Sequence, residues 1–235
     1  MYLCKANAKV VKFTILQKLK RIIFDIMKEY TNISTLIFDF GDVLIKLNLK
    51  RCIQNIKNLG INDVEKYLSN FGQSDFFMKF EVGEIGIQEF RNEIRILTAQ
   101  EVSDEEIDAA WCSFLEEIPQ EKLDLLVELR KKYKLLLLSN TNPLHIEHNA
   151  TLEFGKRGKT MYDYFDKCYL SYQMKMAKPD KNIFLEVLAD ANVKAEECLF
   201  LDDGIKNIET AKSLGFKTYH VDPKENLDFL LTAIH

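Results

Sequence analysis

Short apolar runs alternate with longer segments of helical periodicity along most of the chain. The runs fall at residues 36–38, 135–140, 167–171, 198–203 and 216–221. The first run is apolar on both faces, as in a parallel strand covered by helices on both sides. Because strand and helix alternate, the connections are crossovers. The pattern predicts an α/β fold with a Rossmann-like core and a mostly parallel sheet.

Residues 49–118 break this alternation, because helical periodicity continues through them without a strand-like run. Ser103 and Glu106 have the spacing of a capping box near the start of the last helical segment of this region. The stretch predicts a helical insert after the first strand. The core is then divided between residues 34–48 and 119–235.

Residues 1–33 carry a separate amphipathic pattern. Apolar residues at 11, 15, 19, 22 and 26 fall on one helical stripe, and basic residues lie on the other side. A basic amphipathic helix can rest on a membrane surface, but such helices more often pack on their own protein or on a partner. We therefore expect an N-terminal amphipathic extension suited to self-association, with membrane binding as the lesser alternative.

Charge and cysteine content narrow the functional class. The net charge of −4 opposes nucleic-acid binding by bulk phosphate attraction, yet it allows a small anionic substrate in a local positive pocket. The five cysteines are scattered and odd in number, which predicts reduced thiols and no zinc site. Because no signal peptide or membrane-length apolar run is evident, a cytoplasmic location is expected.

Polar side chains follow four of the five runs, at strand ends that meet in one crevice of an open parallel sheet. In chain order they are Asp39, Ser139, Asn140, Lys178, Asp202 and Asp203. A phosphate ester repels a carboxylate nucleophile, so attack by Asp39 requires cations nearby, which Mg²⁺ and Lys178 would supply. Aspartates are hard oxygen ligands suited to Mg²⁺. The set therefore predicts phosphoryl transfer.

Four segments at these positions resemble the motifs of the haloacid dehalogenase superfamily of aspartate-nucleophile hydrolases. They are "LIFDFGDVL", "LLLLSNTN", "KPDKNIF" and "LFLDDGIKNIETAKSLG". The resemblance extends from about residue 35 to the C-terminus, and the helical insert is similar to the family's cap domain. Together with "FEVGEI" and "LSNTNPLH", the motifs are most similar to the bacterial sugar-phosphate phosphatases of the alpha-glucose-1-phosphatase type.

The resemblance implies roles for individual residues. Asp39 would be the nucleophile that forms an aspartyl-phosphate, and Lys178 would neutralise nucleophile and phosphate together. Ser139 and Asn140 would hold phosphate oxygens.

The same resemblance implies a Mg²⁺ site. Asp203 would be the direct ligand, with Asp202 and Asp39 beside it and the backbone carbonyl of Gly41 completing the protein's share. Asn207 could hold a metal-bound water.

The chain departs from the family at the general acid. Phosphatases of this family usually carry a second aspartate two residues after the nucleophile, where this chain has Gly41. Asp42 follows one residue later, and the alternation of side chains along an extended segment turns it away from the face of Asp39. Asp42, water and a substrate hydroxyl all remain open as the proton source.

Several residues near the expected crevice carry less specific signals. Phe80 and Glu81 lie where the cap of similar enzymes reaches over the substrate, and both are candidate substrate contacts, although Phe80 also fits a core position. Trp111 is interpreted as cap packing. His145 and His148 are interpreted as hydrogen-bonded surface residues of a helix.

The sequence thus favours a Mg²⁺-dependent phosphatase of a small phosphorylated metabolite, in particular a sugar phosphate. Two alternatives remain. One is the metal-independent dehalogenase branch of the family, against which the aspartate pair 202–203 argues. The other is an inactive protein that binds phosphorylated ligands, to which Gly41 lends support.

Overall fold

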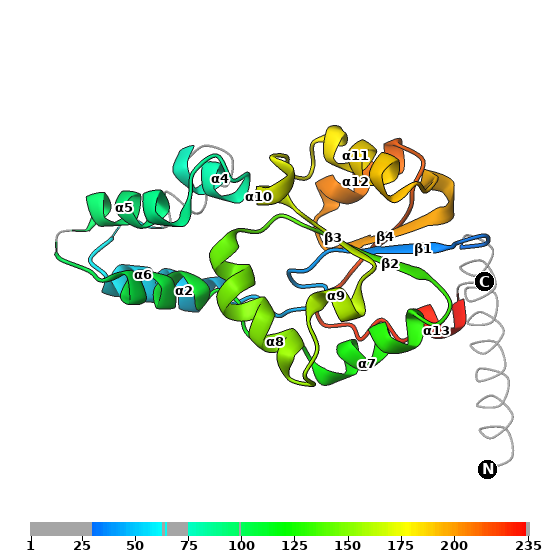
Figure 1. Cartoon of the computed structure of the whole chain (residues 1–235), viewed down its shortest axis with the longest axis horizontal. Coiled ribbons are helices and arrows are strands. Elements are labelled where there is room, and N and C mark those ends of the chain that lie inside the picture. The colour runs from blue at the N-terminus through cyan, green and yellow to red at the C-terminus, as the bar shows by residue number, and fades with distance from the viewer. Residues whose placement is uncertain (1–29, 63, 65–74, 99, 234–235) are drawn as a thin grey trace, which may run out of the picture.

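The computed structural model describes residues 30–62, 64, 75–98 and 100–233 of the 235-residue chain. Figure 1 shows two parts, a core built on a β-sheet and a cap of helices at one end of it. The predicted self-association helix lies outside the described residues. In the described part of the chain, no helix is long and apolar enough to cross a membrane.

A five-stranded parallel sheet forms the centre of the core. Its strands are β1 (Thr35–Phe38), β2 (Lys134–Ser139), β3 (Lys167–Leu170), β4 (Cys198–Asp202) and β5 (Lys217–His220). Their order is β3-β2-β1-β4-β5, and every adjacent pair is parallel. The five apolar runs therefore all form strands, and the predicted Rossmann-like arrangement is confirmed. Because β1 is central, with Phe38 level with Leu137 and Leu201, the ends of β1, β2 and β4 meet at one edge.

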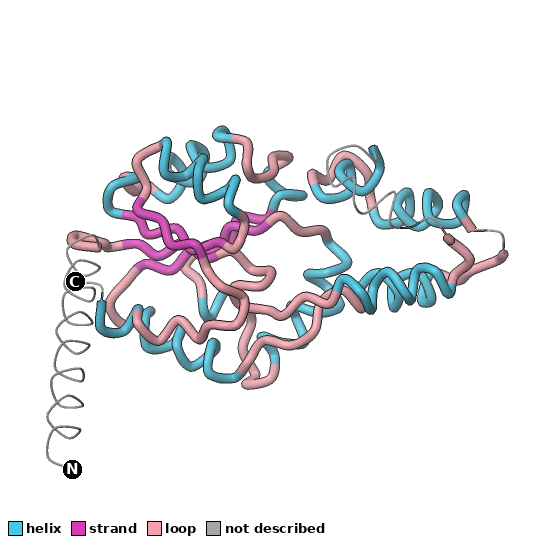
Figure 2. The backbone as a smooth tube through the Cα atoms, turned by 180° about the vertical axis from the view of Figure 1, so that it is seen from behind, coloured by secondary structure: helices cyan, strands magenta, loops and turns pink. Residues whose placement is uncertain are grey.

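Helices cover both faces of the sheet (Figures 1 and 2). One face packs against α7 (Gln120–Leu129), α8 (Thr151–Gly155), α9 (Met161–Tyr164) and α13 (Leu230–Ala233), and the other against α11 (Lys181–Ala191) and α12 (Ile205–Ser213). Leu36 and Phe38 point into the first layer, and Ile37 points into the second. This alternation explains why β1 is apolar on both faces.

The cap contains α2 (Leu49–Asn58), α4 (Asp75–Glu81), α5 (Ile87–Leu97) and α6 (Asp104–Cys112). It has its own apolar cluster, in which the rings of Phe80 and Phe90 stack at 4.2 Å. The predicted capping box is confirmed, because the Ser103 side chain accepts from the Glu106 N–H and the Glu106 carboxylate accepts from the Ser103 N–H.

Two extended linkers join the cap to the core, and they pair with each other. Asn48 N–H donates to the Phe114 carbonyl at 2.7 Å, and Glu116 N–H donates to the Lys46 carbonyl at 2.8 Å. The prediction of helix through residue 118 was wrong, because α6 ends at Cys112. Leu115, on the return linker, is buried in the core cluster rather than on a helix face.

The predicted boundary at residue 33 was also wrong. Tyr30 and Ile33 are both buried in the core cluster, and the Tyr30 hydroxyl donates to the Thr218 carbonyl at 3.3 Å. Residues before β1 therefore contribute to the packing of the core.

The turn between α12 and β5 depends on one glycine and provides a test of the fold. Gly215 has φ +92°, a conformation in which a side chain is strained by about 1–2 kcal/mol. Gly215→Ala should lower the free energy of unfolding by that amount, measured by urea denaturation. Gly155→Ala, at an open helical position without positive φ, is the control and should be neutral or slightly stabilising. Equal effects of the two substitutions would contradict this account of the turn.

Other shorter helical elements complete the structure. They are the π-helix η1 (His145–Ala150), α10 (Ser171–Met174) and the 3-10 helix η2 (Ala195–Glu197). Of these, η1 and α10 lie where the cap meets the core (Figure 1).

Candidate active site

The residues predicted to carry chemistry come together at the carboxyl edge of the sheet. Lys178, on the loop between α10 and α11, places its ammonium 2.7 Å from a carboxylate oxygen of Asp39 and 2.7 Å from one of Asp202. Asp39 follows β1, and Asp202 ends β4. All three side chains are buried, with Asp202 fully enclosed. One cation is therefore held between two carboxylates away from bulk water.

The oxygens of Asp202 are occupied by partners within the protein. Oδ2 accepts from Lys178, while Oδ1 accepts from the Gly204 N–H at 2.7 Å and from the Asn207 side chain at 2.9 Å. A Cβ at position 204 would lie 2.9 Å from Oδ1, so this approach requires glycine. Asn207, predicted to hold a metal-bound water, donates to Asp202 and orients it.

The carboxylates of Asp39, Asp202 and Asp203 form a group suited to a divalent cation. Each offers one oxygen atom, and these three atoms lie within 4.8 Å of one another. The donors are hard oxygens, which fits Mg²⁺. The Gly41 carbonyl, predicted as a further ligand, accepts the Val43 N–H at 2.6 Å and retains one lone pair.

Burial and neighbouring charges shift the pKa values of Asp39 and Lys178 in opposite directions. Burial raises the pKa of Asp39 to about 7, and the Lys178 ammonium opposes that rise. For Lys178, burial lowers the pKa, but the charges of Asp39 and Asp202 outweigh it and the pKa is raised. Lys178 therefore stays protonated, and it favours the ionised form of Asp39.

Ser139, which ends β2, and Asn140, which follows it, differ in their contacts. Asn140 accepts from the Lys178 N–H and donates to the Lys178 carbonyl, both at 2.8 Å. Its side chain was predicted to hold phosphate, whereas these bonds fix the loop that carries Lys178. The Ser139 hydroxyl has only a long contact of 3.4 Å, to the Asn140 carbonyl, which leaves it available for another partner.

The position of the usual general acid is filled by an apolar side chain. A Cβ on Gly41 would lie 2.9 Å from a methyl group of Leu47. Asp42 has φ +52°, and its carboxylate accepts the Leu47 N–H at 3.1 Å. Asp42 also lines a cavity of about 380 Å³ with Lys122 and Glu225. These contacts hold Asp42 to its own loop.

The two predicted cap contacts differ in exposure. Phe80 is 0% exposed within the cap's aromatic cluster, so the predicted contact with substrate is contradicted. Phe80 packs in this cluster near the end of α4. Glu81 is partly exposed at the same helix end, and burial raises its pKa to about 7. The role of Glu81 as a substrate contact stays a prediction.

His145 is buried, so its interpretation as a surface residue was wrong. Its ring stacks on Trp111 at 5.2 Å, and its Nδ1 lies 3.1 Å from the Asn142 side chain. Burial lowers the pKa of His145 to about 4, which keeps it neutral. His148 is half-exposed and lies 3.6 Å from Asp108. Trp111 packs in the cap as predicted and also donates to Asn142 of the core.

Ser171, at the start of α10, was not identified from the sequence. It is 0% exposed, and its hydroxyl contacts main-chain atoms of Thr141 and Glu81. The available signal was its place directly after β3, in "KCYLS", at the edge where the other site residues gather.

Comparison with known proteins places this geometry in a family. The model of haloacid dehalogenase-like hydrolases matches residues 33–215. A D-ribitol-5-phosphate phosphatase from Bacteroides thetaiotaomicron is 38% identical over 197 residues, which are 84% of this chain and 95% of that protein.

Solved structures agree with this placement. A haloacid dehalogenase family enzyme from Bacteroides thetaiotaomicron, in complex with magnesium and inorganic phosphate, superimposes with a TM-score of 0.80 at 44% identity. The match covers 84% of this chain and 98% of that one. A predicted hydrolase of the same family from Porphyromonas gingivalis gives a TM-score of 0.79 at 40% identity, covering 86% and 97% of the two chains. The chain belongs to the haloacid dehalogenase-like hydrolases.

Proposed function

We propose that the protein is a Mg²⁺-dependent phosphatase that hydrolyses a small sugar phosphate or sugar-alcohol phosphate through an aspartyl-phosphate. The observation that carries this proposal is the contact of Lys178 with both Asp39 and Asp202, beside a third carboxylate at Asp203. The related phosphatase named for D-ribitol 5-phosphate supports the substrate class. The related structure with magnesium and phosphate supports the cofactor.

In the first step, an oxygen of Asp39 attacks the phosphorus of the ester. The bond from phosphorus to the ester oxygen breaks, and the leaving alkoxide takes a proton from water or from a substrate hydroxyl. Lys178 offsets negative charge on nucleophile and phosphate throughout, and the Ser139 hydroxyl can donate to a phosphate oxygen. Mg²⁺ bound at the aspartates would supply further positive charge at the phosphate.

In the second step, water attacks the phosphorus of the aspartyl-phosphate. Inorganic phosphate leaves, and the Asp39 carboxylate is regenerated. Asn140 holds Lys178 in place during both steps through its two main-chain bonds. The cap lies over this side of the core and would limit the access of other water molecules (Figure 1).

The cap supports a polar substrate rather than an apolar one. Glu81 brings a carboxyl group to the end of α4, where the cap contacts the core through the Glu81 carbonyl and Ser171. A carboxyl group can accept from or donate to the hydroxyls of a polyol. We therefore assign Glu81 to substrate recognition.

Both alternatives have weaker support. A metal-independent dehalogenase has no use for Asp203 beside Asp39 and Asp202. An inactive binding protein has no need for a nucleophile next to a buried cation, which is costly to maintain without function.

Asp39→Asn should abolish phosphate release, because the amide is nearly isosteric with the carboxylate but is a poor nucleophile. The expected loss of kcat is more than about a thousandfold, measured with D-ribitol 5-phosphate and a panel of sugar phosphates. Asp124→Asn, at an exposed carboxylate paired with Arg157, is the matched control and should retain activity. Activity of Asp39→Asn close to that of the parent would exclude Asp39 as nucleophile.

Asp203→Ala should weaken Mg²⁺ activation by at least about 100-fold, because it removes a carboxylate of the cation site. The measurement is the rate of phosphate release against Mg²⁺ concentration, with binding of the metal alone followed by calorimetry. A variant that binds Mg²⁺ as tightly as the parent would show that Asp203 is not a ligand.

The missing general acid should make the rate depend on the leaving group. With no acid at position 41, kcat should fall steeply from aryl to alkyl phosphates. The double substitution Gly41→Asp with Leu47→Ala makes room for the added carboxyl and should raise alkyl rates by up to about 10²–10⁴-fold. Leu47→Ala alone is the control and should leave the dependence steep. A flat dependence in the parent that becomes steep in Asp42→Asn would instead identify Asp42 as the acid.

A further inference from the structure

Ser171 connects three segments that are far apart in the sequence. Its Oγ accepts from the Thr141 N–H at 2.9 Å, on the loop that follows Ser139 and Asn140. The same hydroxyl lies 2.6 Å from the Glu81 carbonyl of the cap and 3.0 Å from the Thr141 carbonyl. Ser171 itself starts α10 after β3. One buried hydroxyl thus joins the cap, the β2 loop and the β3 end.

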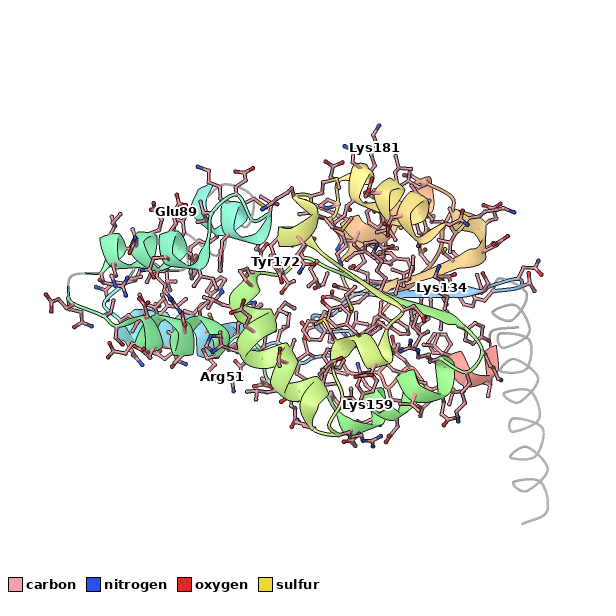
Figure 3. All side chains as sticks on the ribbon, viewed as in Figure 1. Arg51, Glu89, Lys134, Lys159, Tyr172 and Lys181 are labelled. Carbon is pink, nitrogen blue, oxygen red and sulfur yellow. The ribbon has the colours of Figure 1, made fainter. Side chains whose placement is uncertain are left out.

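Neighbouring residues strengthen the contact of α10 with the end of α4. Lys175 donates from its ammonium to the Gly83 carbonyl. Gly83 lies so close to α10 that a Cβ there would be 2.2 Å from the Tyr172 carbonyl. Figure 3 labels Tyr172 on α10, at the side of the core that faces the cap. The main chain of residues 81–83 therefore packs against α10.

The other side of the cap is attached differently. Trp111 of α6 donates to the Asn142 side chain and stacks on His145, and the Cys112 thiol contacts the Leu144 carbonyl. Leu144 is part of the cap's apolar cluster although it belongs to the core chain. This side combines apolar packing with hydrogen bonds, whereas the α4 side relies on polar contacts to main-chain atoms. The two sides of the cap therefore meet the core through contacts of different kinds.

We propose that Ser171 is a positioning residue that couples the α4 end of the cap to the phosphate-binding loop after β2. This inference rests on the proposed function, since it assigns phosphate to the loop of Ser139. Phosphate bound to that loop would hold Thr141 in place and, through the Ser171 hydroxyl, stabilise the existing contact with the Glu81 carbonyl. Bound phosphate would therefore favour the cap position seen in this structure, with the end of α4 on Ser171.

The hydroxyl geometry allows the contact to open and close. Ser171 has one proton and two acceptors, the carbonyls of Glu81 and Thr141. When the cap separates, the proton can stay bonded to Thr141, so opening leaves no buried donor without a partner. The contact therefore biases the position of the cap while permitting release of product.

Hydrogen exchange of the cap segment 80–87 tests this coupling without depending on turnover. In the parent protein, inorganic phosphate with Mg²⁺ should bind and slow exchange in this segment further, because phosphate stabilises a contact that the free protein already makes. Ser171→Ala should still bind phosphate, measured by calorimetry, but phosphate should no longer protect the segment. Ser113→Ala is the matched control, because its hydroxyl donates at 2.6 Å within the cap and not to the core.

The outcomes separate this inference from the proposed function. Failure of the parent to bind phosphate with Mg²⁺ would contradict the proposed function. In that case, hydrogen exchange without phosphate still tests the role of Ser171. Amides of segment 80–87 should exchange about 3- to 10-fold faster in Ser171→Ala than in the parent. Unchanged exchange in the free variant, or phosphate protection equal to that of the parent, would overturn the role of Ser171.

A second variant covers the case in which Ser171→Ala does not fold. Lys175→Met removes the ammonium bond to the Gly83 carbonyl and leaves the Thr141 contacts in place. It should also reduce the protection of segment 80–87 by phosphate, while the affinity for phosphate changes less than about twofold. Full protection in Lys175→Met would mean that α10 does not hold the cap.

Discussion

The site depends on a single buried cation shared by two carboxylates. Removing a charge from water is costly, and the cost is offset only where partners of opposite sign lie close. Lys178 meets this condition at 2.7 Å from both Asp39 and Asp202. Asn140 fixes the main chain of Lys178, and the Gly204 N–H fixes Asp202. The parallel sheet contributes by aligning the strand ends, so that the nucleophile lies beside the charge that stabilises its attack on phosphate.

The cap has its own apolar cluster and contacts the core at separate places. The linkers near Lys46 and Glu116 pair with each other where they join the cap to the core. Trp111 joins the cap to the loop after β2 on one side, and Ser171 joins it to the same loop on the other. The loop that would hold phosphate is therefore also the loop on which the cap rests. In the coupling that we propose through Ser171, substrate binding and the position of the cap are linked by this loop.

The strands, whose residues are buried on both faces, and the polar residues at the strand ends could be predicted from the sequence. Both follow from local patterns and from the parallel topology. Asp39 and Asp202 are examples, since each directly follows or ends an apolar run. Contacts between residues far apart in the sequence could not be predicted in this way. The pairing of Asn140 with Lys178 depends on how a loop folds 38 residues away. The burial of His145 depends on Trp111, which comes from the inserted cap.

In the proposed mechanism, phosphate is transferred to Asp39 before it is released. Acid quenching of the enzyme during rapid turnover with Mg²⁺ and a sugar phosphate, followed by peptide mass mapping, tests it most directly. We expect one phosphoryl group on the peptide that contains Asp39, formed and lost at rates that match turnover. Rapid phosphate release with that peptide unmodified, or a phosphoryl group on another residue, would contradict the account.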